Sequence, residues 1–411
     1  MDLVKKTSNL IESLTGKYSR PLFLSGADLP SVKPAPTGIL GLDMALAGGL
    51  PRGGVTIISG KENSMKTTLA ILAARNCLPL LYLDADRSYN EAWFSGLGLD
   101  SSQVLVAYPE SMEEAWDILS GELRNPTWGS FIVDSLGMLS PDKEMTSRSE
   151  DPDAVGLRAR LTNKLARKVM GSLTPYSSSL IVFVNHLYAS IGSVPMPDEM
   201  PCGAGIRFAA LVTVNLKRTE RIPTDRGKTL EGVRIQWRVD KSKVSPHGGI
   251  GTFTFWIAEG EREGVEMPAG TIDLAEQFER YMPDVGLLER AGGYYNLNLP
   301  SGKSRFQGKS AMRSGVLQHQ QAIYDAVFSK GYTPEGDLKR RHAEYMEAFE
   351  AERAKRPKGR AKKAEPEPVN VPAKHEKALR ELRAVGVALG GAESALPDDD
   401  GNADEGIDSE P

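Results

Sequence analysis

The residues with the clearest chemical potential form a loop that nearly matches a phosphate-binding motif. Residues 60–67, GKENSMKT, follow the pattern G-x-x-x-x-G-K-[ST], except that Met65 stands at the second glycine. An apolar run ends at Ser59 and a helical pattern begins near Lys66, a context that aims backbone N–H groups at an anion. In this chemistry Lys66 reaches the β- and γ-phosphates of ATP, and the Thr67 hydroxyl ligates Mg²⁺. The residues predicted to bind the nucleotide here are Gly60, Lys61, Glu62, Asn63, Ser64, Met65, Lys66, Thr67 and Thr68.

Polar side chains at three other strand ends are suited to complete such a site. FIVDS places Asp134 at a strand end, where its carboxylate is expected to hold the Mg²⁺ shell. YLDAD places Asp84 and Asp86 at another strand end, where a catalytic base orients water, and VFVNH places His186 at a third. Each residue alone is also compatible with a purely structural role. Because ligands of open α/β sheets bind at the carboxyl ends of the strands, the four strand ends together predict one site.

These strand ends require a mostly parallel sheet to position them. Between about 37 and 260, short apolar runs alternate with helical patterns, which predicts an α/β sheet covered on both faces. After residue 206 the apolar segments alternate like antiparallel strands, and a smaller α+β unit is predicted at about 268–330. The predicted elements are strands at 53–60, 78–86, 103–109, 129–135 and 179–186, helices at 66–76, 89–98, 111–123 and 155–173, and antiparallel strands at 208–218, 233–243 and 251–260.

Composition agrees with an ordinary globular protein. The chain has 411 residues, of which 40% are hydrophobic and 25% charged. No run approaches the roughly 18 apolar residues of a membrane span, and the N-terminus predicts a short amphipathic helix rather than a signal peptide. Only two cysteines occur, Cys77 and Cys202, so we expect no disulfide framework. These features predict a cytoplasmic protein without a membrane partner.

Charge is unevenly distributed along the chain. Residues 339–383 carry a net charge of +6, residues 384–411 carry −8, and residues 1–338 carry −2. The stretch RPKGRAKKAEPEPVNVPAK predicts a disordered linker, and the acidic end is most simply a solubilising tail. Autoinhibition or recruitment of a partner by this tail is a further hypothesis. Charge alone neither supports nor excludes a nucleic-acid partner.

Several segments, in the same order, resemble the RecA family of recombinases. The resemblance extends over about 35–310. Met65 before the loop lysine, and the Asn185–His186 pair, resemble the phage UvsX-type branch of that family in particular. The similar segments are 37–60 before the ATP loop, 82–100 around the D-A-E segment, 155–171 after the first DNA loop, 180–192 entering the second DNA loop, 239–246 at the K-x-K element, and 286–310 in the small C-terminal domain.

The resemblance implies roles around the nucleotide. Trp93 falls where an aromatic ring stacks on adenine, although a core position is the alternative, and His186 falls on the γ-phosphate sensor. Asp86 falls on the catalytic base, which is usually Glu. Because Asp is one methylene shorter, we expect slower hydrolysis, or water held by a shifted backbone.

The resemblance also implies residues that act between subunits. Lys241 and Lys243 fall where a neighbouring subunit supplies cations to the γ-phosphate, and such cations stabilise transition-state charge. A solvated strand face is the alternative for these two lysines. Arg207 falls on another cation that acts in trans, and Phe208 on an aromatic that couples the ATP state to the interface.

DNA contacts are expected on one helix and two loops. Arg160, Lys164 and Arg167 are three or four residues apart, so they share one helix face, although a basic face is often only solvated. The first loop, 141–154, is acidic for a DNA contact. The second, 188–205, is rich in glycine and proline, which suits sequence-independent binding through backbone amides. There the resemblance implies Ile191 as the wedge between bases, and the expected DNA-binding residues are Tyr188, Ile191, Gly192 and Gly203.

Together these features predict an ATP- and Mg²⁺-dependent recombinase. We expect it to form a homo-oligomeric helical filament on single-stranded DNA, to pair it with duplex DNA, and to work with single-strand-binding and mediator proteins. A hexameric helicase with the same core, and a non-catalytic mediator with a weakened ATP site, are the alternatives. The predicted organisation is an N-terminal polymerisation helix (1–34), a RecA-like P-loop core (35–265), a small α+β domain (266–333) and a charged, largely disordered tail (334–411).

Overall fold

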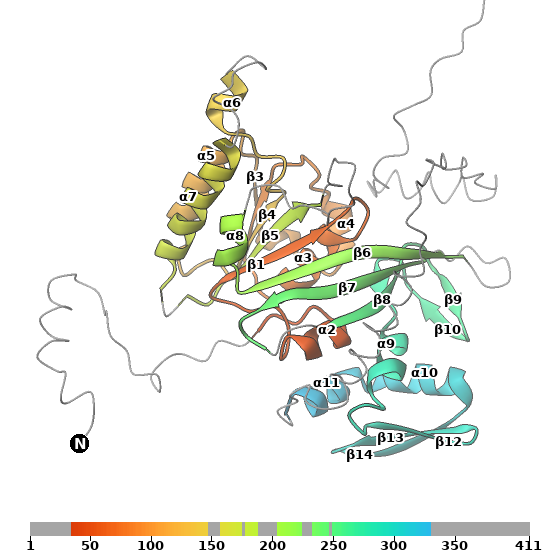
Figure 1. The fold of residues 1–411 in the computed structure, drawn as a ribbon. Helices are drawn as coiled ribbons and strands as arrows, with labels where there is room; N and C mark the ends of the chain where they lie inside the picture. The colour runs from red at the N-terminus through yellow and green to blue at the C-terminus, as the bar shows by residue number, and fades with distance from the viewer. Residues whose placement is uncertain are drawn as a thin grey trace, which may run out of the picture.

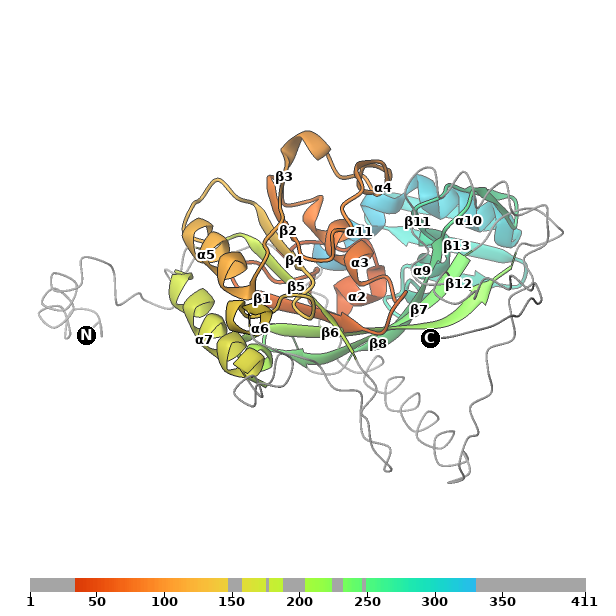
Figure 2. The ribbon, with the colours of Figure 1, turned by 90° about the horizontal axis from the view of Figure 1, so that it is seen from above.

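A large mixed sheet with helices on both faces dominates the computed structural model (Figure 1, Figure 2). The structure describes residues 34–146, 157–174, 177–187, 204–223, 232–245 and 249–329. The predicted α/β class is confirmed. The elements of the core are α2 (Leu40–Ala45), β1 (Val55–Gly60), α3 (Lys66–Ala74), β2 (Leu80–Asp84), α4 (Glu91–Gly96), η1 (Ser101–Gln103), β3 (Val104–Ala107), α5 (Met112–Glu122), β4 (Ser130–Asp134), α6 (Asp142–Thr146), α7 (Leu157–Ser172), β5 (Leu180–His186), α8 (Ala204–Ala209), β6 (Val212–Ile222), β7 (Gly232–Ser242), β8 (Ile250–Trp256), β9 (Gly260–Arg262), β10 (Val265–Met267) and β11 (Thr271–Ile272).

The strand order places the chemically interesting strand ends side by side. The nine strands run β11-β8-β7-β6-β1-β5-β4-β2-β3, and those from β6 to β3 are parallel. Gly60 lies opposite His186, and Asp84 lies opposite Asp134, so these strands end at the same level. The carboxyl ends of β1, β2, β4 and β5 therefore meet at one edge of the sheet.

Strand β6 differs from the sequence-based expectation of a purely antiparallel half. It pairs in parallel with β1 on one side and antiparallel with β7 on the other. The reason is topological: the chain reaches β6 through α8, a crossover that returns it alongside β1, whereas β7 and β8 follow as antiparallel neighbours.

Two buried clusters cover the two faces of the sheet. Helices α2, α3 and α4 pack on one face, and helices α5, α7 and α8 pack on the other, as Figure 2 shows from above. Every residue of β1, β2 and β4 is buried, which explains why these strands read as continuous apolar runs rather than alternating ones.

A smaller α+β unit follows the core and shares a hydrophobic cluster with α2 (Figure 1). Its three strands form an antiparallel sheet in the order β12-β13-β14, and β13 alternates buried and half-buried residues. Arg313, which is almost fully buried, donates a hydrogen bond to Asp273 at the start of α9, at 2.7 Å. The elements are α9 (Leu274–Tyr281), β12 (Leu288–Ala291), β13 (Tyr294–Leu299), β14 (Gly302–Gln307), α10 (Gly308–Gln318) and α11 (Gln320–Ser329).

Several sequence-based expectations fall outside the described residues. These are the N-terminal helix, the charged tail 334–411, most of the first predicted DNA loop and nearly all of the second. The predicted domain boundaries therefore stay predictions. Within the described ranges, no helix has both the length and the apolar character required to span a bilayer.

Candidate nucleotide and DNA sites

The loop between β1 and α3 closes tightly on itself. A Cβ added to Gly60 would lie 2.4 Å from both the Leu216 carbonyl oxygen and Ser64 Oγ, so only glycine fits there. The Lys61 carbonyl accepts hydrogen bonds from Ser64 Oγ at 2.7 Å and from Lys66 Nζ at 2.9 Å. Lys66 is buried, and burial lowers its pKa, although the carboxylates of Asp134, Asp86 and Glu62 oppose that shift. The loop thus holds a desolvated cation where a phosphate is expected.

Met65 adopts the backbone conformation that the missing glycine would supply. Its φ is 66° and its ψ is 31°, in the left-handed region, immediately before the first residue of α3. Asn63 also has a positive φ, of 56°. A left-handed conformation costs an ordinary residue roughly 1–2 kcal/mol. The Met65 side chain packs against the buried cluster beneath α3, a contact that offsets part of this cost.

A buried carboxylate connects the loop to the neighbouring strands. Asp134 Oδ2, at the end of β4, accepts hydrogen bonds from Thr67 Oγ1 at 2.6 Å and from the Tyr82 hydroxyl at 2.9 Å. Burial raises the pKa of Asp134 to about 6, and the nearby Asp86 adds to the rise, while Thr67, Tyr82 and Lys66 oppose it. The predicted Mg²⁺ ligands Thr67 and Asp134 are therefore already in contact.

Asp86 and His186 meet beside this carboxylate. Asp86 Oδ1 accepts hydrogen bonds from the Ser135 backbone N–H at 3.0 Å and from Ser135 Oγ at 2.9 Å. Asp86 Oδ2 lies 3.6 Å from His186 Nε2. Burial acts to raise the pKa of Asp86, but the bonds from His186 and Ser135 outweigh it and leave the pKa below its usual value. The Asp134–Ser135 peptide bond is cis.

The other aspartate of this strand end has a structural role. Asp84 is buried, and its carboxylate accepts hydrogen bonds from the backbone N–H groups of Ser88 at 3.0 Å and Tyr89 at 2.9 Å. These bonds fix the loop that follows β2. Of the two aspartates, Asp86 is therefore the one that faces Lys66, Asp134 and His186.

Trp93 lies on α4, beside the same edge of the sheet. Its indole is half-buried, and it meets the Phe255 ring edge-on with a centroid separation of 6.0 Å. Asn90 caps the helix by accepting a hydrogen bond from the Trp93 backbone N–H at 2.8 Å. The ring is thus fixed on one side by the core, and its stacking on adenine stays a prediction.

The donor set at this edge fits a nucleotide with Mg²⁺. Within the described ranges, no group of three or more His, Cys, Asp or Glu side chains is placed to hold a metal ion by itself. Mg²⁺ does not require such a group, since it is commonly held by one or two carboxylates together with substrate phosphates. A hydroxyl from Thr67, a carboxylate from Asp134 and the buried Lys66 cation match that requirement.

A second cluster of predicted residues gathers at the C-terminal end of α8. Lys241 Nζ donates hydrogen bonds to the carbonyls of Arg207 and Phe208, and Lys243 Nζ lies 3.4 Å from the Phe208 carbonyl oxygen. Burial, and the positive charge of Lys243, lower the pKa of Lys241. The Phe208 side chain is 76% exposed. The structure thus brings together the four residues predicted to act between subunits.

This second cluster lies far from the phosphate-binding loop of its own chain. Lys241 is opposite Thr213, which is opposite Ile57, whereas the loop begins after Gly60. The Lys243 backbone lies further from the loop still. Its N–H donates to the Leu211 carbonyl, and the Leu211 N–H donates to the Val55 carbonyl at the start of β1. Since a strand rises by roughly 3.3 Å per residue, Lys241 and Lys243 are level with points roughly 10 and 17 Å along β1 from its end. Whether the cluster acts on the nucleotide of a neighbouring subunit stays a prediction.

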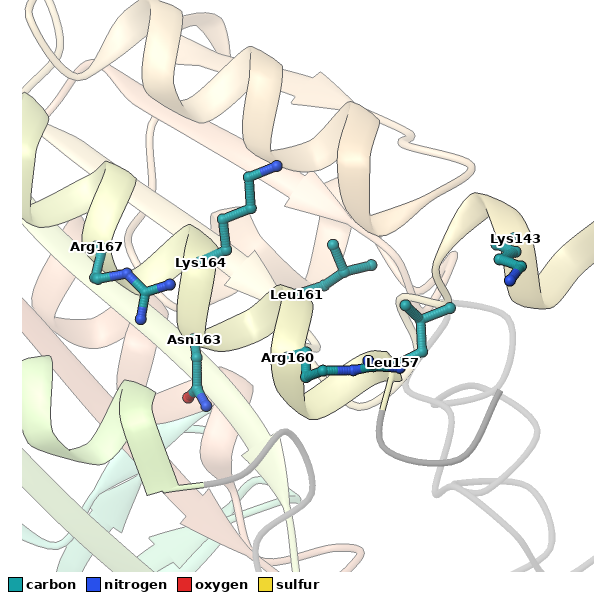
Figure 3. A pocket seen from close by; sticks show the side chains of 7 residues that line it. All are labelled: Lys143, Leu157, Arg160, Leu161, Asn163, Lys164 and Arg167. Atoms are coloured by element: carbon teal, nitrogen blue, oxygen red, sulfur yellow. The ribbon is translucent and has the colours of Figure 1, made fainter. Parts of the chain in front are cut away.

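The predicted basic helix face lines an open hollow. Arg160, Lys164 and Arg167 are exposed on α7 and border a cavity of about 750 Å³, together with Lys143 of α6 (Figure 3). Figure 3 shows Lys143 beyond the N-terminal end of α7. Arg158, on the same helix, donates hydrogen bonds to the Gly137 carbonyl at 3.2 Å and to Ser140 Oγ at 3.0 Å, which ties α7 to the loop after β4.

Some site residues were not anticipated from the sequence, and some predicted ones are not described. Ser135, Tyr82 and Lys143 have no motif of their own, although Ser135 directly follows the strand-end Asp134. Contacts between the strands and helices reveal them only after folding. The predicted DNA-binding residues outside the described ranges are Tyr188, Ile191, Gly192 and Gly203.

One family model and several known proteins of the same family match this chain. Residues 3–260 match the family model described as the RecA N-terminal domain. The chain is 31% identical to protein RecA of Chlorobaculum parvum over 302 residues, which cover 71% of this chain and 83% of that protein. It is 30% identical to protein RecA of Bifidobacterium breve over 327 residues, or 78% of each chain. It is 33% identical to protein RecA of Crocosphaera subtropica over 296 residues, or 71% of this chain and 80% of that protein.

The backbone at Met65 leads to a paired prediction. Met65→Gly should retain nucleotide binding and change the free energy of unfolding by no more than about 1 kcal/mol, because relief of the left-handed cost is offset by lost packing and by chain entropy. Met65→Val should lower it by about 1–3 kcal/mol and weaken nucleotide binding, since a β-branched residue is strained at positive φ. Chemical denaturation and nucleotide titration measure both. Equal behaviour of the two variants would contradict the backbone argument.

Proposed function

This chain belongs to the RecA family, and from that premise we propose that it is an ATP-dependent recombinase that pairs and exchanges DNA strands. It forms a helical filament on single-stranded DNA and takes up homologous duplex DNA. The observation that carries the proposal is the convergence of Lys66, Thr67, Asp134, Asp86 and His186 at one edge of the sheet. A phosphate-binding loop, a buried carboxylate and a candidate base lie together there.

The family resemblance suggests a role for each of these residues, and their contacts support it. The loop amides and Lys66 bind the phosphates, and the Trp93 ring stacks on the adenine. Thr67 and Asp134 would hold Mg²⁺, which when bound would neutralise developing phosphate charge. Asp86 orients the attacking water, and Ser135 fixes one of its oxygens so that the other faces His186. His186 senses the γ-phosphate and is the last residue of β5, directly before the second DNA loop, so a shift of its ring reaches that loop.

ATP sits between subunits in this proposal. Lys241 lies level with Ile57, three residues before the end of β1, and Lys243 lies level with the start of β1, which supports a role for both lysines outside their own loop. They complete the site of the neighbouring subunit, with Arg207 beside them and the exposed Phe208 ring in the subunit contact. Hydrolysis is thereby coupled to assembly, because the nucleotide site of an isolated subunit has no neighbour to supply these cations.

DNA contacts in this proposal use the α7 face and the two loops. Arg160, Lys164 and Arg167 neutralise backbone phosphates, and Lys143 of α6 adds a fourth cation beyond the N-terminal end of α7. The loop residues Ile191 and Gly192 wedge and line the bases, with Tyr188 and Gly203 at the loop ends. Met65 and His186 favour the phage UvsX-type branch, which places the protein in a bacterial host cytoplasm, with single-strand-binding and mediator proteins as partners.

Two measurements distinguish this function from a helicase and from a non-catalytic mediator. We expect ATPase activity that is low alone and stimulated by single-stranded DNA, and open helical filaments by electron microscopy with ATP and that DNA. Closed rings of uniform subunit number would favour a hexameric helicase. DNA binding with no ATPase activity under either condition would favour a mediator with a weakened ATP site.

Mixing of inactive subunits tests whether Lys241 acts in trans. Lys66→Ala should abolish nucleotide-dependent activity, and Lys241→Ala should lower DNA-stimulated ATPase by about tenfold or more, because the γ-phosphate loses a cation. Filaments mixed from the two variants should regain activity above either alone, since a Lys66→Ala subunit supplies the intact Lys241 to its neighbour. Normal activity of Lys241→Ala, or no gain on mixing, would refute the trans assignment.

Salt dependence tests the α7 face. Arg167→Ala should weaken binding to single-stranded DNA and lower the slope of log affinity against log salt by roughly 0.7 for the one lost phosphate contact. Lys168→Ala is the matched control, because Lys168 lies on the same helix, pairs with Asp117 at 3.6 Å and does not line the hollow. Equal slopes for the two variants would remove Arg167 from the DNA interface.

A further inference from the structure

Tyr82 is a buried polar side chain that the mechanism above does not use. It lies in the middle of β2 with no exposed surface, within a cluster of aromatic rings. Its ring is 5.3 Å from that of Phe94, edge-on, and 6.0 Å from that of Tyr89. A phenylalanine would fill this apolar volume without a hydroxyl to satisfy, so the presence of tyrosine needs a reason.

The reason is visible at the end of the ring. The Tyr82 hydroxyl donates a hydrogen bond of 2.9 Å to Asp134 Oδ2, the same oxygen that accepts from Thr67 Oγ1 at 2.6 Å. Two donors on one oxygen, from different elements, fix the plane in which this buried carboxylate lies. Without Tyr82, the donor that remains for that oxygen in the described part of the chain is Thr67, at the start of α3 and directly after the phosphate-binding loop.

We propose that Tyr82 is a positioning residue that holds Asp134 in the orientation needed to complete the Mg²⁺ shell with Thr67. The inference rests on the proposed function, because it concerns the same nucleotide site. Groups that hydrogen-bond a metal-binding carboxylate set its direction, and their loss commonly lowers metal affinity by about 10–100-fold. Tyr82 itself touches neither nucleotide nor metal.

The aromatic cluster gives this positioning a second consequence. Phe94 follows Trp93 on α4, so the helix that carries the predicted adenine contact packs directly on the ring that holds Asp134. The Tyr89 ring also packs on Phe94, at 4.9 Å. The rings of Tyr82, Tyr89 and Phe94 thereby connect the strand that positions Asp134 to the helix that carries Trp93.

The test compares Tyr82→Phe with Tyr89→Phe. Each variant removes one hydroxyl from the same aromatic cluster and keeps its ring, but no hydrogen bond of the Tyr89 hydroxyl is found in the described part of the chain. The first measurement is the thermal stabilisation of the full chain by ADP at a series of Mg²⁺ concentrations, which requires no turnover. The second is the ATPase rate, with single-stranded DNA, over the same series. The melting temperature without nucleotide monitors folding.

For Tyr82→Phe we expect the half-saturating Mg²⁺ concentration to rise by about tenfold or more. The rate at saturating Mg²⁺ should stay within about twofold of that of the original protein, and Tyr89→Phe should match the original in both measurements. An unchanged Mg²⁺ dependence in Tyr82→Phe would overturn the inference, as would a lower rate at saturating Mg²⁺ with no shift in half-saturation. If the original protein shows no Mg²⁺-dependent response to ADP, it is the proposed function that fails.

Discussion

The rest of the candidate site depends on the hydrogen bonds that the buried Asp134 carboxylate accepts. This carboxylate joins three elements that are far apart in the sequence: the phosphate-binding loop through Thr67, strand β2 through Tyr82, and strand β4 through its own backbone. A carboxylate so deeply buried is stable only when its oxygens are hydrogen-bonded. The surrounding groups are therefore constrained as strongly as the carboxylate itself, which makes this edge of the sheet a preformed site rather than a set of mobile side chains.

The sheet also separates the two groups of residues that the proposed function uses. Lys66, Asp86, Asp134 and His186 lie at or just beyond the carboxyl ends of the parallel strands, whereas Lys241 lies level with the middle of β1 and Lys243 with its start. The lysine cluster and the phosphate-binding loop are therefore set apart along the strand direction. A nucleotide site that needs both must be completed by assembly, and this physical separation links ATP hydrolysis to filament formation in the proposed function.

The two residues that depart from the family pattern are accommodated in different ways. Met65 meets a backbone requirement, because the loop enters α3 through a left-handed conformation, and its packing on the core offsets part of the cost. The family resemblance places Asp86 where Glu is usual, and Asp is one methylene shorter. Its shorter side chain is held by Ser135 and lies beside His186, so the candidate base and the candidate sensor are in direct contact. Each carboxylate oxygen of Asp86 therefore lies beside a neighbouring side chain.

The fold class could be predicted from the sequence, and so could the candidate loop and the residues that follow the strands. Short apolar runs without alternation favour strands buried on both faces when helical patterns alternate with them, and the loop motif gains its meaning from the polar strand ends around it. The sequence also identified the α7 cations, because helical spacing is local. Only the tertiary structure decided which of Asp84 and Asp86 faces the site, that Tyr82 and Ser135 support it, and that the Lys241 cluster lies away from its own loop. These facts depend on contacts between strands distant in the chain, and no local pattern of residues encodes such distances.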